Sequence, residues 1–445
     1  MIVPSNRLIF FFALIVPPFV ALATIWAPAS PIAVLIGGAL AFTAMLDAAR
    51  ARETLREITI EMGEFTRLQK GRPGQFELKF GNIGRSRRTV RVGCILPAEI
   101  TTPEEERMIE LPAGTEASVC VWPCTPTIRG LFHISGVMLE TASPLGLWAR
   151  RERRPLRHEL RVYPDLLAER QKVAGLFLRR GMTGTHSQRR AGQGREFEKL
   201  REYIPGDCLS DVHWKASAKR RHLVTKVHQI ERSHEVYVVV DASRLSGREV
   251  AGQPGVTALE RYVTAALILG AAAERQGDQF GLITFSDHIL TFLRARAGQA
   301  HFGTCREHLY TLQPQPVTPD YEELCAFIRS RLNKRALVIF LTALDDPFLA
   351  ESFIDASKLI SRQHLILVNM LRPAGVRPIF QNTTGSIDSI DDVYHELAGH
   401  LHWDKLRELE GILRQRGVRF NLLDPDMISA ELVQQHADVR AQELV

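Results

Sequence analysis

The chain has 445 residues, of which 45% are hydrophobic, and a formal net charge of +6. This length allows two or three domains, each with a full hydrophobic core. Lys and Arg concentrate between Arg150 and Arg232, so the excess charge is local and suits anionic lipid or an acidic protein. Aromatic residues interleaved as base-stacking platforms are not evident there, so a nucleic-acid partner is not expected.

Two apolar runs stand at the N-terminus. Leu8 to Trp26 is long enough to cross a bilayer, and Pro31 to Leu46 follows after a short loop. We therefore expect residues 1–50 to form a transmembrane helical hairpin. The loop holds no Lys or Arg, whereas Arg7 precedes the pair and Arg50 follows it. The positive-inside rule then places both flanks, and the C-terminal bulk of the chain, in the cytoplasm.

A cleaved signal peptide is the alternative for the first run, because small residues stand at Ala27 and Ala29. The second run would then be a stop-transfer anchor, which still leaves the rest of the chain inside. Only a second run that fails to span would export the large domain.

The six cysteines form no CxxC pair, and Cys120 and Cys124 stand one residue too far apart for that motif. Free thiols in a reducing compartment are therefore expected. The six are Cys94, Cys120, Cys124, Cys208, Cys305 and Cys325.

Residues 56–162 have the pattern of a small β-sandwich. Short alternating runs such as 75–80 and 89–94 are separated by Gly, Asn and Pro. The spacing of the turn signals predicts an immunoglobulin-like arrangement of strands. Residues 163–232 are basic and Gly-rich, but they lack a phosphate-binding motif. We expect a solvated, mobile loop there.

From residue 233 to 445 apolar runs of strand length alternate with amphipathic helices. This pattern predicts a mostly parallel, doubly wound sheet covered by helices on both faces. The run Ile289 to Leu293 follows Phe285 too closely for a helical crossover and is expected to be an antiparallel edge. The other predicted strands are Val236 to Asp241, Phe280 to Phe285, Leu337 to Leu341, Leu365 to Met370 and Arg419 to Leu423. The predicted helices are Leu259 to Arg275, Tyr321 to Lys334, Phe348 to Arg362 and Trp403 to Gly417.

The first of these strands ends in a carboxylate and hydroxyls, at the edge where open α/β sheets bind ligands. Asp241 and Ser243 there resemble the DxSxS loop of von Willebrand factor type A domains. The resemblance implies a hard divalent cation such as Mg²⁺, bound by oxygen ligands. Leu245 replaces the second serine of the motif. The full predicted ligand set is Asp241, Ser243, Ser246, Thr318 and Asp345.

A second resemblance lies just upstream, in residues 197–207 and 212–219. These residues resemble the defining motif of the bacterial domain-of-unknown-function fifty-eight (DUF58) family, and the resemblance covers about Gly192 to Val445. Ser210 departs from the family's usual Arg. The residues expected to bind a partner or to carry the motif are Arg201, Tyr203, Gly206, Asp207, Trp214 and Lys215.

Members of this family often accompany MoxR-type AAA+ ATPases, so the resemblance implies such a partner and an unknown client protein. The expected function is a non-enzymatic adaptor in the bacterial inner membrane, with a cation-assisted docking site. The alternatives are a metal-dependent hydrolase at Asp241 and Asp345, and a binder of anionic lipid or nucleic acid through the basic segment.

His395 and His400 look like part of a zinc-protease signature, but they stand five residues apart instead of four. On one helix they would point about 140° apart, so they are not expected to share a zinc ion.

Overall fold

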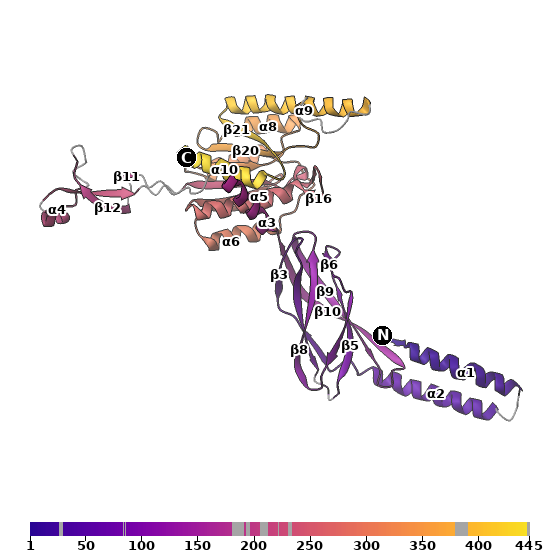
Figure 1. Ribbon diagram of the computed structural model, residues 1–445. Helices are drawn as coiled ribbons and strands as arrows, with labels where there is room; N and C mark the ends of the chain where they lie inside the picture. Colours follow the sequence, from indigo (N-terminus) through magenta and orange to yellow (C-terminus); the bar gives the residue numbers. More distant parts are fainter. Residues whose placement is uncertain are drawn as a thin grey trace. The chain divides into compact units, whose positions relative to one another are not determined.

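The computed structural model describes residues 1–25, 30–82, 84, 86–179, 191–192, 196–204, 212–220, 222–229, 234–378 and 390–442. The chain divides into two compact units, Met1–Asp165 and Leu166–Val445 (Figure 1). The first unit contains the predicted membrane segments and the β-sandwich. The second contains the basic segment and the α/β domain.

The first unit begins with β1 (Ile2–Pro4), followed by two apolar helices that lie side by side (Figure 1). These are α1 (Asn6–Ile25) and α2 (Ser30–Ala51). Within α2 the segment Val34–Ala51 is long and apolar enough to cross a membrane, whereas the apolar part of α1, Asn6–Ala21, is shorter. Most of the predicted loop between the helices lies outside the described residues.

Both ends of this helix pair are joined to strand β10 (Trp148–Tyr163) or to the turn before it. β1 pairs with β10 in antiparallel orientation. Near the end of α2 the buried Asp47 carboxylate accepts hydrogen bonds from Ser143 Oγ at 2.5 Å and from Leu145 N at 3.0 Å. The indole of Trp148 donates to the carbonyl of Ala44 at 2.8 Å. The end of α2 is therefore fixed to the β-structure.

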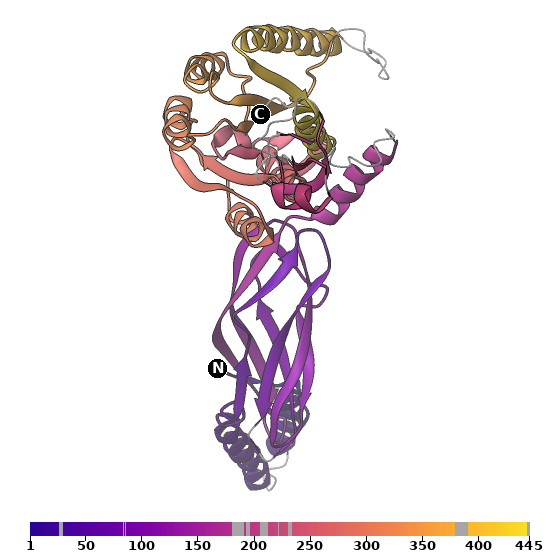
Figure 2. The same cartoon turned by 90° about the vertical axis from the view of Figure 1, so that its left-hand side faces the viewer.

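The rest of the first unit is a sandwich of two sheets, as predicted (Figure 2). Alternate residues point inward, and inward residues of both sheets form one core around Trp122 and Phe76. One sheet has the order β1-β10-β9-β5-β7, with β3 paired to β10, and the other has the order β2-β4-β8-β6. The remaining strands are β2 (Ile58–Glu61), β3 (Phe65–Gln69), β4 (Gly74–Asn82), β5 (Arg88–Ile95), β6 (Ile100–Thr101), β7 (Glu106–Leu111), β8 (Thr115–Pro126) and β9 (Gly130–Ala142).

The cysteines in the described part of the chain are free thiols, as predicted. Burial raises the pKa of Cys94 to about 12 and that of Cys124 to about 11. Cys208 lies outside the described residues.

The second unit is built on a six-stranded sheet of order β18-β17-β14-β19-β20-β21. Five strands are parallel, and β18 pairs antiparallel with β17, which confirms the predicted sheet and its edge. The central strands are apolar on both faces because helices cover each side. The strands are β14 (Glu235–Asp241), β17 (Gln279–Phe285), β18 (Ile289–Arg296), β19 (Leu337–Leu341), β20 (Leu365–Leu371) and β21 (Val418–Leu423).

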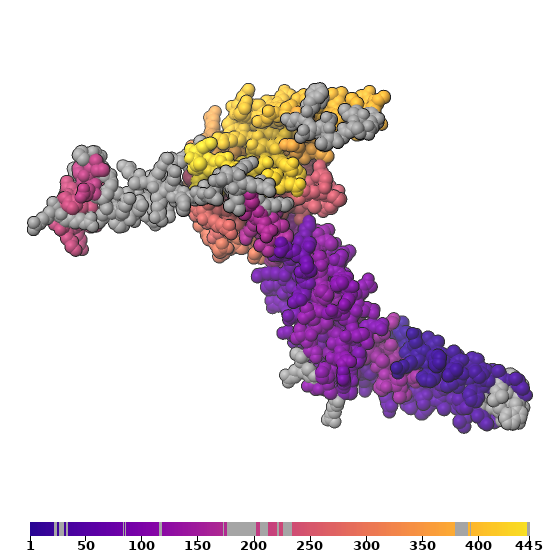
Figure 3. Space-filling model, viewed as in Figure 1, coloured from indigo at the N-terminus to yellow at the C-terminus, as the bar shows by residue number. Residues whose placement is uncertain are grey.

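Helices α7, α8 and α9 pack on one face of this sheet, and α5, α6 and α10 pack on the other. Helix α9 lies on the surface of the domain (Figures 1 and 3). It begins thirteen residues before the predicted Trp403, and α6 and α10 were not predicted. The helices are α5 (Ala258–Arg275), α6 (Gln299–Tyr310), α7 (Tyr321–Arg331), α8 (Pro347–Ser357), α9 (Ile390–Gln415) and α10 (Ile428–Ala441).

The basic segment contains regular structure where a loop was predicted. Helix α3 (Leu166–Arg179) packs against α5 and α10. A small sheet of order β11-β13-β12 follows, and helix α4 (Trp214–Arg220) contacts β13. Its strands are β11 (Ala191–Gly192), β12 (Glu196–Glu202) and β13 (Val224–Gln229).

Candidate functional site

Three loops meet at the carboxyl end of the α/β sheet. The loop after β14 is bonded to the 315–320 loop, because Gln315 N donates to the carbonyl of Ala242 at 2.7 Å and Arg244 N donates to that of Val317 at 3.0 Å. The third loop follows β19, which lies beside β14. The fold thus brings the predicted site segments together at one edge.

Asp241 is fully buried at the centre of this edge. Its Oδ1 accepts a hydrogen bond from Ser243 N at 2.7 Å, and its Oδ2 accepts one from Thr342 Oγ1 at 2.6 Å. Burial raises the pKa of the Asp241 carboxyl above its usual value, and the bonds from Thr342 and Ser243 oppose that shift. Both oxygens of Asp241 therefore already have donors from the chain.

Two buried tyrosines extend this network. Tyr321 Oη lies 2.8 Å from Thr342 Oγ1, and Tyr262 Oη donates to the carbonyl of Thr342 at 3.2 Å. Because the single proton of Thr342 Oγ1 is used toward Asp241, Tyr321 is the donor in its own contact. Burial is the main cause that raises the pKa of both phenols, and the charges of Asp241 and Asp345 raise it further. The network is a closed set of buried polar groups.

The serines after Asp241 serve the loop itself. Ser243 caps the 3₁₀ helix Arg244–Gly247, because its Oγ accepts from Leu245 N at 3.4 Å. Ser246 Oγ donates to the carbonyl of Ser243 at 2.8 Å. Leu245, which stands where the type A motif has serine, is buried in the core. The loop therefore offers fewer free hydroxyls than the motif implies.

The two remaining predicted ligands lie at the margin of the edge. Thr318 is exposed, beside the bonded Val317. Asp345 is largely buried, with 14% of its side chain exposed, and its Oδ2 accepts from Arg248 Nη1 at 2.5 Å. Its Oδ1 is buried and has no hydrogen-bond partner within the described parts of the chain.

As arranged, these residues do not fit a divalent cation. The oxygens of Asp241 and one oxygen of Asp345 are engaged by chain donors, and Ser246 is turned to the backbone. In the described residues no group of three or more His, Cys, Asp or Glu side chains is placed to hold a metal ion. The Mg²⁺ site stays a prediction from the sequence.

Sequence reasoning missed four residues of this edge: Thr342, Tyr321, Tyr262 and Arg248. Thr342 carried a usable signal, because it directly follows β19, whose carboxyl end lies beside that of β14. Tyr321, Tyr262 and Arg248 carried none, since nothing local marks a helix tyrosine or an exposed arginine as a partner of a distant polar group.

The second candidate site is the motif segment around α4. His213 begins the helix, with its Nδ1 3.1 Å from Ala216 N. The buried Ser217 hydroxyl accepts from Val224 N at 2.9 Å and donates to the carbonyl of His213 at 3.0 Å. Helix α4 is thereby held against the start of β13.

Exposed apolar and exposed basic side chains both lie on this segment. Trp214 is 64% exposed, and the backbone bonds Tyr203 N to Leu223 O and His213 N to Val224 O bring its neighbours close. We define the Trp214 surface as the exposed residues Ile204, Trp214, Lys215, Lys219 and Leu223.

The other motif residues are placed as follows. Tyr203 is half-buried, and Arg201 pairs with Thr225 in the register of β12 and β13. Gly206, Asp207 and Ser210 lie outside the described residues. The predicted motif set is thus brought together only in part.

His395 and His400 both lie in α9, and His400 stacks on Trp403 and lies 3.4 Å from Asp404. His395 is exposed on the same helix.

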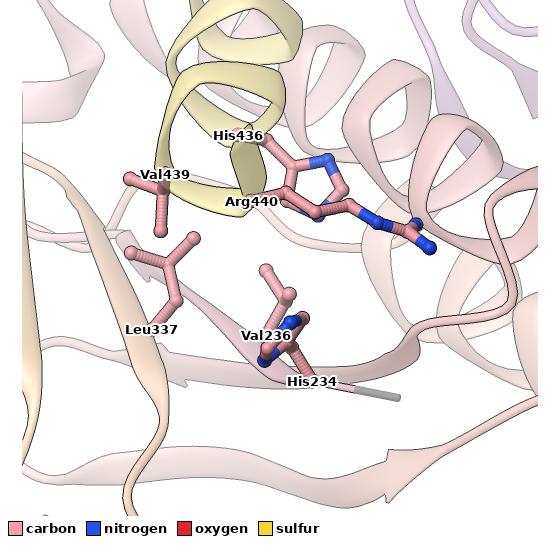
Figure 4. Close-up of a pocket in the computed structure, with 6 residues that line it drawn as sticks. All are labelled: His234, Val236, Leu337, His436, Val439 and Arg440. Carbon is pink, nitrogen blue, oxygen red and sulfur yellow. The ribbon is translucent and has the colours of Figure 1, made fainter. Parts of the chain in front are cut away.

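A further polar cluster lies at the opposite, amino end of the sheet. The fully buried Asp278 accepts from His436 Nε2 at 3.0 Å and from Arg440 Nη1 at 3.3 Å. His436 and Arg440 line a small cavity of about 10 Å³, together with Val236, Leu337 and two other side chains (Figure 4). That volume is about the room that one water molecule needs, so the cavity is too small for a substrate.

The family comparison bears on the second unit. A family described as "Protein of unknown function DUF58" matches residues 199–377, which supports the predicted family resemblance. No curated protein matches the chain.

Similar solved structures include the conserved hypothetical protein BatB from Bacteroides thetaiotaomicron, with 14% identity, 47% of this chain and 100% of that chain covered, and a TM-score of 0.29. Another is the ASH/PapD-like domain of human CEP192, with 9% identity, 24% and 86% covered, and a TM-score of 0.18.

Proposed function

We propose that the chain is a membrane-anchored, non-enzymatic adaptor that binds a partner protein through its Trp214 surface. The observation that carries the proposal is an indole, 64% exposed, on a segment that also has two exposed aliphatic side chains and two exposed lysines. Tryptophan is enriched among the few residues that supply most of an interface's binding energy. The lysines favour an acidic partner surface and speed its approach.

Membrane attachment is supported by the apolar segment Val34–Ala51. We infer that α1 and α2 cross the membrane as a hairpin, because β1 before α1 and the end of α2 are both joined to the same part of the sandwich. Arg50 and Arg52 then favour a cytoplasmic position for the rest of the chain.

The partner that the family resemblance implies is a MoxR-type AAA+ ATPase, with an unknown client. A sheet with helices on both faces and a carboxylate at its carboxyl edge supports assignment of the α/β domain to the von Willebrand type A class. Partner binding in this proposal does not require Mg²⁺, because each oxygen of Asp241 already accepts a hydrogen bond from the chain.

The test uses the full chain in lipid nanodiscs and a purified MoxR-type AAA+ ATPase as the probe. We expect Trp214→Ala to weaken binding about tenfold or more, and Lys215→Glu with Lys219→Glu to weaken it and reduce its salt dependence. The matched control is Phe348→Ala, an 83% exposed aromatic on α8. Dissociation constants that are unchanged in both surface variants would overturn the proposal.

A further inference from the structure

The carboxyl edge of the sheet holds two carboxylates in a mostly buried setting. Asp241 is fully buried and Asp345 is 14% exposed. Both lie close enough to Tyr262 and Tyr321 for their charges to act on these phenols. A buried carboxylate is costly unless it is paired with a positive charge or fully hydrogen-bonded. Asp241 has a donor at each oxygen, so Asp345, whose buried Oδ1 has no partner within the described residues, is the carboxylate that needs a compensating cation.

Arg248 supplies that positive charge. Its guanidinium Nη1 lies 2.5 Å from Asp345 Oδ2, and its side chain is half-exposed. The backbone of Arg248 is held on both sides, because its N–H donates to the carbonyl of Leu245 at 3.3 Å and its carbonyl accepts from Ala258 N at 2.9 Å. The loop that begins at Asp241 thus has a fixed backbone at Arg248, and the Arg248 guanidinium lies at the edge beside Asp345.

A divalent cation would have to compete with this arrangement. Mg²⁺ requires about six oxygen ligands in near-octahedral geometry. At this edge one lone pair on each oxygen of Asp241 already accepts a hydrogen bond, from Ser243 N and from Thr342 Oγ1. An ion beside Asp345 would also be repelled by the guanidinium.

We propose that Arg248 is a built-in cation that takes the place of a divalent metal at this edge. The native edge is therefore metal-independent, and loss of Arg248 uncovers a latent site at Asp345. The inference goes beyond the adaptor function and does not depend on the Trp214 surface, so each can fail alone.

The experiment measures Mn²⁺ bound per chain by electron paramagnetic resonance, with the full chain in detergent. We expect Arg248→Ala to bind one more Mn²⁺ than the native chain at about 1 mM of the ion, the range of weak protein sites. Arg248→Lys keeps the charge and should bind no more than the native chain. Arg244→Ala, which removes an exposed arginine from the same loop, is the matched control and should also gain nothing.

The double variant Arg248→Ala with Asp345→Asn should lose the gained ion, which assigns it to Asp345. Hydrogen exchange of residues 235–241 in each variant verifies that β14 remains folded. A native chain that binds Mn²⁺ and loses it on Asp345→Asn would overturn the proposal. A folded Arg248→Ala variant that gains no ion would overturn it equally.

Discussion

The two ends of the α/β sheet each bury one aspartate completely, but the two carboxyl groups have different kinds of hydrogen-bond donor. At the carboxyl end, Asp241 accepts hydrogen bonds from a backbone N–H and from the Thr342 hydroxyl, both neutral donors. At the amino end, Asp278 accepts from the Arg440 guanidinium, from a ring nitrogen of His436 and from the backbone N–H of His234.

The two aspartates therefore have different roles. Asp278 holds secondary-structure elements together, whereas the carboxyl of Asp241 has a pKa that burial raises. Asp278 ties α10 to the starts of β14 and β17, and its partners are 158 and 162 residues away in the sequence. Among the described residues no cation contacts Asp241, and burial raises the pKa of its carboxyl. The ion pair of this edge is formed by Arg248 and Asp345, whose side chains are closer to solvent than that of Asp241.

The largest effect is expected at the amino end. Asp278→Ala would leave a buried His436 and the Arg440 guanidinium without their carboxylate, which should destabilise the domain by about 3 to 5 kcal/mol. Hydrogen exchange of α10 and β17 in the full chain measures this loss. Asp438→Ala, an exposed carboxylate on the same helix, should change stability by less than about 0.5 kcal/mol. Similar losses of stability in the two variants would show that Asp278 does not hold α10 to the starts of β14 and β17.

A smaller effect is expected for Thr342→Val, which keeps the side-chain shape. The change removes the donor to Asp241 and the acceptor for Tyr321. Two buried polar groups lose a partner, so the cost should be about 2 kcal/mol, measured by hydrogen exchange of β14 and β19. The control is Thr304→Val, whose hydroxyl is exposed on α6. A loss no greater than that of the control would refute the closed network.

The smallest effect is a pH dependence at Asp241. The pKa of Asp241 is raised in the folded state, so folding favours the protonated carboxyl. The stability that this carboxyl contributes therefore falls as pH rises above the usual value of 3.8. Asp241→Asn cannot ionise. The stability of the native chain minus that of the variant should therefore decrease as pH rises. A difference that grows with pH would mean that the pKa is lowered instead.

The sequence alone determined the elements whose patterns are local. Mostly apolar runs gave β14, β17, β19, β20 and β21 nearly to the residue, because strands covered by helices have few polar positions. Alternation of apolar and polar residues identified the strands of the sandwich, because only one face of each of its sheets is buried. The elements it missed have weaker patterns: α6 has only three buried residues, Cys305, Leu309 and Tyr310.

Only the tertiary structure decided what the candidate site contains. Asp241 and Ser243 were visible as a loop motif, but Thr342 is 101 residues from Asp241, and Arg248 is 97 residues from Asp345. Such contacts depend on which strands are neighbours and on how each loop leaves the sheet edge. Periodicity specifies which face of an element is buried, whereas strand order specifies which polar groups meet. The sequence thus located the edge, and the folded chain placed an arginine where the motif implied a metal.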